Sequence, residues 1–344
     1  MKKAKMLIST ILTAVIILTV AACSRSGTAS QGSADRSSAG QPDVELTVAS
    51  AAASTNAGYQ FMLDAADTAT NKSGGKLKFR VVWDATLGND GELIESCIDG
   101  SIPVIALFSS APLLSYIPEI AIFDMPAVYE SKEQAYSGIS QFKNFFNDIF
   151  QKKNLKIVGM GFNGFRGLTT NQNLQTPADF RGMKIRTMEN RYHMAFWTNM
   201  GSSPTPLAFS ELYLALQQGL IHAQDNPIAA VYASKFYEVQ KYYMPVTVFP
   251  SVLLVIMNLD AYNALPAEYK VLVEEFSETF MRVSYEQNDQ TEEDAIKAMG
   301  SAISALPYTN EIKAAMKSAA EPVWTQIAQS IGADVAEAYI KTGR

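Results

Sequence analysis

The sequence predicts an α/β protein built as two lobes that a hinge connects. The chain has 344 residues, 48% of them hydrophobic. Because single cores stop growing at roughly 250–300 residues, we expect two lobes. Segments with strand periodicity and segments with helix periodicity alternate, and they do so in two successive sets. This alternation is typical of sheets whose strands are connected by crossover helices.

The first α/β set follows a polar N-terminal segment. Alternating or continuous apolar residues predict its strands, and Asn and Gly residues mark the ends of its helices. The last helix of the set has a face of phenylalanines. Strands are expected at 44–50, 77–83, 102–108 and 155–159, and helices at 56–72, 90–99 and 131–150.

The second set has the same character and ends in long helical stretches. Pro177 favours a helix start, because proline suits the first helical position. Pro266 opens the longest stretch. Strands are expected at 183–186 and 220–224, with two apolar runs within 247–258 that cross between the lobes, and helices are expected from 177, at 189–200, 210–218, 266–304 and 310–342.

Residues 1–22 have the features of a lipoprotein signal peptide. Three lysines precede an apolar stretch, and small residues lead into Cys23. This ending resembles a bacterial lipobox, which implies that Cys23 carries a lipid and begins the mature chain. The alternative is an uncleaved membrane helix, which needs about 20 apolar residues. Residues 23–43 are rich in Ser, Gly, Ala and Gln, and we expect a flexible tether there.

The charge balance argues against nucleic acid as a partner. The net charge is −6, and removal of the three leader lysines makes it more negative. A protein this acidic lacks the basic surface that phosphate backbones require. An arginine that binds an anion must therefore act locally, against the overall field.

Other kinds of chemistry have little support in the sequence. Residues 159–164 satisfy the pattern G-x-G-x-x-G, but extended chain and no helix follows them, so we expect close packing and no dinucleotide site. The two histidines, His193 and His222, have no second metal ligand at a suitable spacing. Cys97 fits a buried structural position. We expect no metal, no cofactor and no enzymatic activity.

A set of motifs occurs in a fixed order, most densely between residues 163 and 227. In order and spacing these motifs resemble the solute-binding proteins of TRAP (tripartite ATP-independent periplasmic) transporters, over nearly all of the chain from Val44 onward. They are Leu87-Gly88-Asn89-Asp90, Gly100-Ser101, Ile117-Pro118-Glu119, Asp124-Met125-Pro126, Asn163-Gly164-Phe165-Arg166, Met183-Lys184-Ile185-Arg186, Pro204-Thr205-Pro206-Leu207-Ala208-Phe209-Ser210-Glu211-Leu212-Tyr213, Ala215-Leu216-Gln217-Gln218-Gly219 and Gln224-Asp225-Asn226-Pro227.

The resemblance implies a periplasmic-binding-protein-like fold, with hinge-connected mixed sheets and a long helix that braces both lobes. It also implies an extracytoplasmic receptor that captures a small organic carboxylate and delivers it to the integral membrane subunits of a TRAP transporter. We expect a monomer. The alternative within the same fold is a protein that presents its ligand to a membrane sensor.

The resemblance also assigns residues to the ligand site. Arg186 matches the arginine that binds the carboxylate, and Arg166 matches a second arginine. Asn226 matches an amide that holds the same carboxylate, and Phe209 matches an aromatic residue that packs on the ligand. Independently, the planar fork of a guanidinium fits a carboxylate through paired N–H donors. The alternative for any arginine is a solvated surface charge.

The resemblance also bears on Asp90 and Phe108. Asp90 lies near the cleft mouth in the family and would meet a ligand hydroxyl, and its alternative role is a helix N-cap. Phe108 and Ala51 stand where the sialic-acid branch has polar residues, so Phe108 predicts an apolar wall and a smaller or more apolar acid.

We expect lobe I at 44–163 plus 252–291, and lobe II at 164–251 plus 292–344.

Overall fold

The computed structural model describes residues 43–102 and 104–343. The predicted leader, the predicted lipidation site at Cys23 and the predicted tether up to residue 42 lie outside the described residues. Within the described ranges, the helices are too short or too polar to cross a membrane.

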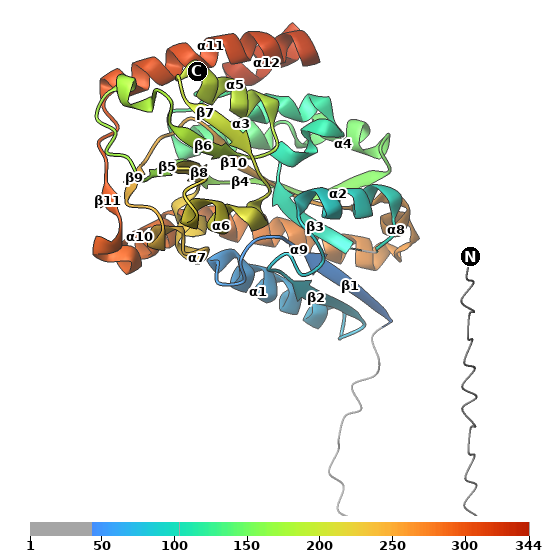
Figure 1. The fold of residues 1–344 in the computed structure, drawn as a ribbon. Helices are drawn as coiled ribbons and strands as arrows, with labels where there is room; N and C mark the ends of the chain where they lie inside the picture. The colour runs from blue at the N-terminus through green and yellow to red at the C-terminus, as the bar shows by residue number, and fades with distance from the viewer. Residues whose placement is uncertain (1–42, 103, 344) are drawn as a thin grey trace, which may run out of the picture. The chain divides into compact units, whose positions relative to one another are not determined.

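A mixed sheet of five strands forms the first part of the fold (Figure 1). The first three of its strands run parallel to one another, and the chain then returns late to add a strand antiparallel to its neighbours. The sequence predicted two strands within 247–258, and the structure has a single strand there. In spatial order the strands are β2 (Leu77–Val82), β1 (Val44–Ala49), β3 (Val104–Ser109), β10 (Pro250–Asn258) and β4 (Leu155–Phe165).

Capping side chains set the starts of the helices on this sheet. α1 (Ala57–Lys72) begins at Asn56, whose side chain accepts a hydrogen bond from the backbone, as the sequence predicts. α2 (Asp90–Asp99) is capped by Asn89. The N-cap role considered for Asp90 is therefore wrong, because Asp90 is the first helical residue.

The second part of the fold is a mixed sheet of six strands. Its central strands come from the segment that carries most of the motifs. In spatial order the strands are β11 (Ser304–Ala305), β9 (Tyr242–Met244), β5 (Gly167–Thr170), β8 (Ala223–Asn226), β6 (Lys184–Thr187) and β7 (Ser203–Pro206). Two mixed sheets with covering helices confirm the predicted α/β class.

Three helical stretches predicted as continuous are each divided in the structure. The segment 131–150 forms two helices around Gln141, the stretch from Pro266 is interrupted at Gln287, and the C-terminal stretch is interrupted at Gly332, where φ is 100°. The resulting helices are α3 (Lys132–Ser140), α4 (Lys143–Gln151), α9 (Ala267–Glu286), α10 (Asn288–Met299), α11 (Asn310–Ile331) and α12 (Ala333–Lys341).

The remaining helices are short and connect the strands of the two sheets. They are α5 (Arg191–Asn199), α6 (Leu212–Gln217), α7 (Ile228–Ala233), α8 (Leu259–Ala264), and the 3₁₀ turns η1 (Ala111–Ser115), η2 (Pro118–Asp124), η3 (Pro177–Phe180), η4 (Phe209–Glu211), η5 (Phe236–Glu238) and η6 (Gly300–Ala302).

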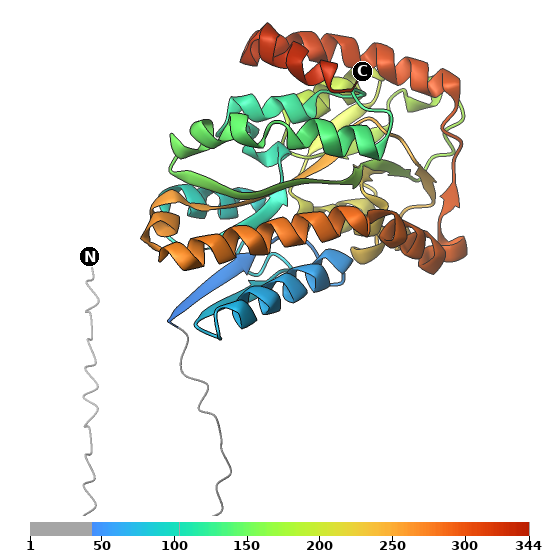
Figure 2. The ribbon, with the colours of Figure 1, turned by 180° about the vertical axis from the view of Figure 1, so that it is seen from behind.

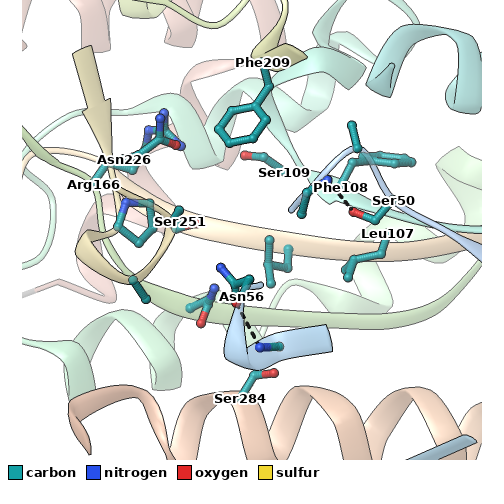
Figure 3. A pocket seen from close by; sticks show the side chains of 18 of the residues that line it. Ser50, Asn56, Leu107, Phe108, Ser109, Arg166, Phe209, Asn226, Ser251 and Ser284 are labelled. Carbon is teal, nitrogen blue, oxygen red and sulfur yellow. Dashed lines mark hydrogen bonds between the residues drawn. The ribbon is translucent and has the colours of Figure 1, made fainter. Parts of the chain in front are cut away.

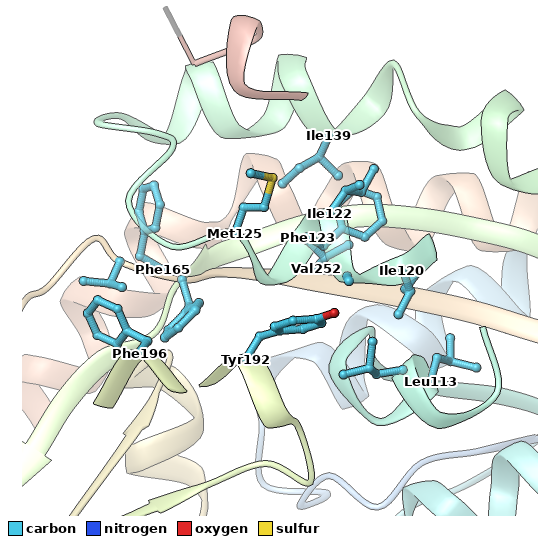
Figure 4. Packing of buried hydrophobic residues seen from close by; sticks show 14 of the residues in the cluster. Leu113, Ile120, Ile122, Phe123, Met125, Ile139, Phe165, Tyr192, Phe196 and Val252 are labelled. Carbon is cyan, nitrogen blue, oxygen red and sulfur yellow. The ribbon is translucent and has the colours of Figure 1, made fainter. Parts of the chain in front are cut away.

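Three hydrophobic cores hold these layers together. One core lies between the first sheet and α1 and α9. A second and larger core joins the other face of the first sheet to the second sheet through η1, η2, α5 and α11. Figure 4 shows Phe123 of η2, Phe196 of α5 and Val252 of β10 among the side chains of this core. A third core lies beneath α6 and α7.

The long C-terminal helices lie on opposite sides of the described body. α9 and α10 run along the side of α1, whereas α11 and α12 cover the far side (Figure 2). α9 packs on β4 at Gly159 and Gly161, where added Cβ atoms would lie 3.0 Å from Ser277 Cβ and 2.9 Å from Met281 Sδ. These glycines therefore serve close packing of a helix on a strand, and residues 159–164 continue β4 without a nucleotide-binding turn.

Candidate functional site

A cleft encloses about 1040 Å³ of space, including solvent at its mouth, and residues from both sheets line it. The first sheet contributes Ser50, Phe108 and Ser251, and the second contributes Arg186 and Asn226. Figure 3 shows the labelled side chains of these strands, together with Phe209 and Ser284, around a common space.

Arg186 owes its position to the alternation of side chains along β6. Its neighbour Ile185 is buried in the large core, so Arg186 points to the opposite face and lines the cleft. The Arg186 side chain is 2% exposed. Its Nε and Nη2 atoms donate to the carbonyl oxygen of Leu207 at 3.0 and 2.7 Å. Its Nη1 atom is buried without a hydrogen-bond partner.

The charge of Arg186 is held at an energetic cost. The pKa of Arg186 is lowered to about 10, chiefly by burial and in part by the nearby charge of Arg166, while the carboxylates of Asp225, Asp90 and Glu189 act in the opposite direction. Within the described residues no carboxylate forms a salt bridge with Arg186. The site thus contains a buried cation with a free donor, which is the arrangement that an anionic ligand completes.

Arg166 also lines the cleft, but its charge is already paired. Its Nε donates to Asp225 Oδ2 at 3.0 Å, and its Nη2 donates to the backbone oxygen of the same residue. Both side chains are almost fully buried, with 3% and 1% exposure. Asp225 was absent from the sequence-based site, although it stands beside Asn226 in the same motif. Arg166 therefore adds positive potential near Arg186 while Asp225 holds its guanidinium in place.

Asn226 ends β8, the strand next to β6 in the sheet. Its amide nitrogen donates to Gln224 Oε1 at 2.5 Å, and the amide nitrogen of Gln224 donates to Thr169 Oγ1 at 2.7 Å. This chain of hydrogen bonds fixes the Asn226 amide at the cleft. An amide nitrogen carries two hydrogens, so one donor remains for a ligand.

Asp90 lies at the first turn of α2 and lines the cleft together with Arg186. The pKa of Asp90 is raised to about 6, chiefly by burial and in small part by the charge of Glu189, while the charge of Arg186 acts in the opposite direction. A carboxyl group with a pKa near 6 changes its protonation within the physiological range, and it can accept or donate a hydrogen bond accordingly.

Two aromatic residues supply apolar surface. Phe209 is half-buried, lines the cleft at the start of η4 and contacts Phe236, with ring centroids 5.8 Å apart. Phe108 is 3% exposed and belongs both to the cleft lining and to the large core. Ala51 also lines the cleft. The structure therefore brings all six predicted residues, Arg186, Arg166, Asn226, Phe209, Asp90 and Phe108, to one cleft.

Several cleft residues were not expected from the sequence. Asn56, Trp83, Ser284 and Asn288 line the cleft on the side of α1 and α9. A signal for the last two existed in retrospect, because Phe280, Ser284 and Asn288 recur at every fourth residue and so lie along one side of the helical stretch. Asn56 and Trp83 gave no comparable signal.

The other candidate groups have structural roles. Cys97 is a free, buried thiol, as expected. His193 is buried against Phe249, with ring centroids 3.9 Å apart, and its Nε2 lies 3.1 Å from Asp124 Oδ1. Within the part of the chain that the structure describes, no group of His, Cys, Asp and Glu side chains is arranged to hold a metal ion.

Comparison with known proteins identifies a family. The sequence model of the family described as "Bacterial extracellular solute-binding protein, family 7" matches residues 48–330. A solute-binding protein of Verminephrobacter eiseniae is 32% identical over 198 residues, which cover 57% of this chain. The chain spans 59% of the length of this relative.

Solved structures of similar fold cover more of the chain. The sugar acid binding protein DctPAm of Advenella mimigardefordensis, in complex with galactonate, has a TM-score of 0.82 and 23% identity, over 88% of this chain and 98% of that one. A TRAP periplasmic solute binding protein from Bordetella bronchispeptica, with density assigned as pantoate, has a TM-score of 0.78 and 29% identity, over 88% of this chain and 99% of that one. These likenesses confirm the predicted resemblance and the two-lobed fold class.

Proposed function

This chain belongs to family 7 of the bacterial extracellular solute-binding proteins, and from that premise we propose that it captures a small organic carboxylate in the cleft and delivers it to a TRAP membrane permease. The observation that carries the proposal is Arg186, a buried cation with an unused Nη1 donor and no salt bridge among the described residues. A carboxylate supplies both the missing charge and the missing acceptor.

The neighbouring side chains have complementary tasks in this proposal. Asn226 donates the second hydrogen of its amide to the same carboxylate. Arg166 contributes positive potential, Phe209 packs on the ligand, and Phe108 forms an apolar wall. Asp90 contacts a ligand hydroxyl. The similar proteins bound to galactonate and to pantoate support a carboxylate ligand, since both molecules carry this group.

Capture requires the two sides of the cleft to separate and close. We assign lobe I to 44–163 plus 252–291 and lobe II to 164–251 plus 292–344, with the hinge at the crossings near 163–166 and 250–252. Two contacts support a closed arrangement here. Thr55 Oγ1 donates to the carbonyl oxygen of Ala233 at 2.7 Å, and Asn190 Nδ2 donates to Asp124 Oδ2 at 2.7 Å.

The place of action follows from the leader and the family. We propose that the protein works outside the cytoplasm as a monomer, anchored to the membrane through a lipid on Cys23, and releases its ligand unchanged. Recovery of the bound acid without chemical change, checked by mass spectrometry, tests binding against turnover.

Calorimetry with matched ligands tests the proposal. Thermal unfolding in the presence of organic acids selects a ligand, and at 100 times its dissociation constant this ligand adds about 2.7 kcal/mol of stability. Titration of the same acid and of its methyl ester then isolates the carboxylate. We expect the ester to bind at least about 100-fold more weakly, because it leaves the buried Arg186 charge uncompensated. Equal binding of acid and ester contradicts the proposal.

A further inference from the structure

The cleft has a second polar surface, which we call the neutral wall, formed by Asn56, Trp83, Ser284 and Asn288. In the described chain the charged residues that line the cleft are Asp90, Arg166 and Arg186. Arg186 and Asp90 lie together with Phe209 at an adjoining recess. Figure 3 shows Phe209 on one side of the space and Asn56 and Ser284 on the opposite side. The neutral wall therefore faces the cationic side across the cleft.

Three atoms of the neutral wall are buried without a hydrogen-bond partner. They are Trp83 Nε1, Ser284 Oγ and Asn288 Oδ1. The three residues are 5%, 6% and 5% exposed, respectively. A buried polar group without a partner is unfavourable, and native proteins rarely leave several of them together. Because all three residues line the same cleft, one bound molecule can contact all of them.

The N-cap of α1 adds a donor to this wall. Asn56 Oδ1 accepts a hydrogen bond from the backbone nitrogen of Gly58 at 2.9 Å. Since the cap occupies the amide oxygen, the amide nitrogen is the end that remains for the cleft, as Figure 3 shows. Capping thus fixes the orientation of a side chain that is also part of the binding surface.

The chemistry of these groups defines their partner. The indole N–H and the Asn56 amide nitrogen donate, Asn288 Oδ1 accepts, and a serine hydroxyl does both. The group that satisfies such a mixed set without adding charge is a hydroxyl. A second carboxylate would find no cation on this wall, and an alkyl chain would leave the donors and acceptors unpaired.

Building on the proposed function, we propose that the neutral wall binds hydroxyl groups at the end of the ligand remote from its carboxylate. The substrate class is then a hydroxylated monocarboxylic acid. Dicarboxylic acids and simple alkanoic acids of the same length are excluded by the absence of matching groups on the wall. Arg186 recognises the carboxylate of the ligand, and the neutral wall recognises the hydroxyl groups at its other end.

A panel of acids of equal carbon number tests this inference by calorimetry on the wild-type protein. The hydroxylated acids are D-galactonate, D-gluconate and L-gulonate, the alkanoic acid is hexanoate, and the dicarboxylic acids are adipate and galactarate. We expect the best aldonate to bind at least about 10-fold more tightly than hexanoate and the dicarboxylates, as expected for several satisfied hydrogen bonds. The inference is overturned if hexanoate or a dicarboxylate binds as tightly, or if no aldonate binds.

Variants on α9 supply a matched control. Ser284→Ala removes the unpaired hydroxyl from the neutral wall. Ser277→Ala removes another buried and unpaired hydroxyl from the same helix, at a position outside the cleft lining. We expect Ser284→Ala to weaken aldonate binding about three- to tenfold and to leave hexanoate binding unchanged, whereas Ser277→Ala changes neither. Trp83→Phe repeats the test with the indole donor. Unchanged aldonate affinity in both wall variants contradicts the inference.

Failure of this inference is distinguishable from failure of the proposed function. If the wall has no role, an acid of the panel still binds through Arg186, and Arg186→Met lowers the affinity for that acid about 100- to 1,000-fold. If the proposed function is wrong, the free carboxylate itself does not matter, and the methyl ester binds as well as the acid.

Discussion

Replacement of Arg186 by methionine separates ligand binding from folding, and its effect on folding follows from the structure. The variant keeps a long side chain at a buried position and removes the charge. The lowering of the Arg186 pKa from its ordinary value to about 10 corresponds to about 3 kcal/mol that the folded protein loses by holding this cation. Methionine removes that cost.

Losses of similar size offset this gain. The two hydrogen bonds to the carbonyl oxygen of Leu207 disappear, at about 1 kcal/mol each. The carbonyl oxygen then lacks these partners, which costs about 1–3 kcal/mol if no water replaces them. We therefore expect the free energy of unfolding without ligand to change by less than about 2 kcal/mol, in either direction.

Ligand binding has no such compensation. Truncation of one partner of a buried, hydrogen-bonded charge pair costs about 2–5 kcal/mol. We expect the affinity for the acid to fall about 100- to 1,000-fold in Arg186→Met. Calorimetry measures the affinity, and urea denaturation of the ligand-free protein measures the stability.

Arg80→Met is the control, because the Arg80 side chain is 59% exposed and lies outside the cleft lining. It should alter neither quantity by more than about 0.5 kcal/mol. If Arg186→Met loses more than about 4 kcal/mol of stability and keeps its affinity, Arg186 is a structural residue and the reasoning is refuted.

Three further predictions concern stability. With a pKa of about 6, Asp90 retains a proton in the folded protein at pH values at which the unfolded chain has lost it. As pH falls from 7 to 4, the free energy of unfolding should therefore rise by up to about 3 kcal/mol relative to that of Asp90→Asn. Parallel profiles of stability against pH for the two proteins, measured by denaturation, would contradict this. Gly167→Ala places a Cβ atom 2.3 Å from Tyr243 Cε2 and should lower stability by about 1–3 kcal/mol in thermal unfolding. Gly91→Ala is a milder control, because its Cβ atom lies 3.3 Å from Asn89 Oδ1. Equal melting temperatures of the two variants would argue against the clash. Asp124→Ala removes the carboxylate that Asn190 Nδ2 and His193 Nε2 contact, and leaves Asn190 Nδ2 with only the carbonyl oxygen of Ala111 at 3.3 Å. The free energy of unfolding in urea should fall by about 2–4 kcal/mol, whereas a loss below about 0.5 kcal/mol would show that water replaces the carboxylate.

Local signals in the sequence were sufficient for most of the fold. Asn56 caps α1 as predicted, and Gly100 ends α2 with φ 70°. The divisions of the long helices were missed because Gln141 and Gln287 carry no breaking signal, and packing against neighbouring elements decides them. β4 is longer than predicted because its glycines pack against α9 and do not form a turn.

The part of the site that comes from the motif-rich segment was predictable from the sequence. Arg186, Arg166 and Asn226 come from that segment, and the alternation along β6 explains how Arg186 reaches the cleft. The neutral wall was not predictable, because Asn56, Trp83 and Asn288 lie far apart in the chain and only the tertiary fold assembles them. The sequence allowed Asp90 to be either a ligand contact or the N-cap of α2, and the structure places the N-cap at Asn89.

The most direct test is a crystal structure of the complex with the acid that gives the largest thermal stabilisation. We predict that the ligand carboxylate accepts hydrogen bonds from Arg186 Nη1 and from the amide nitrogen of Asn226. A carboxylate bound elsewhere, with Arg186 still bonded to the Leu207 carbonyl alone, would contradict the assignment of this cleft.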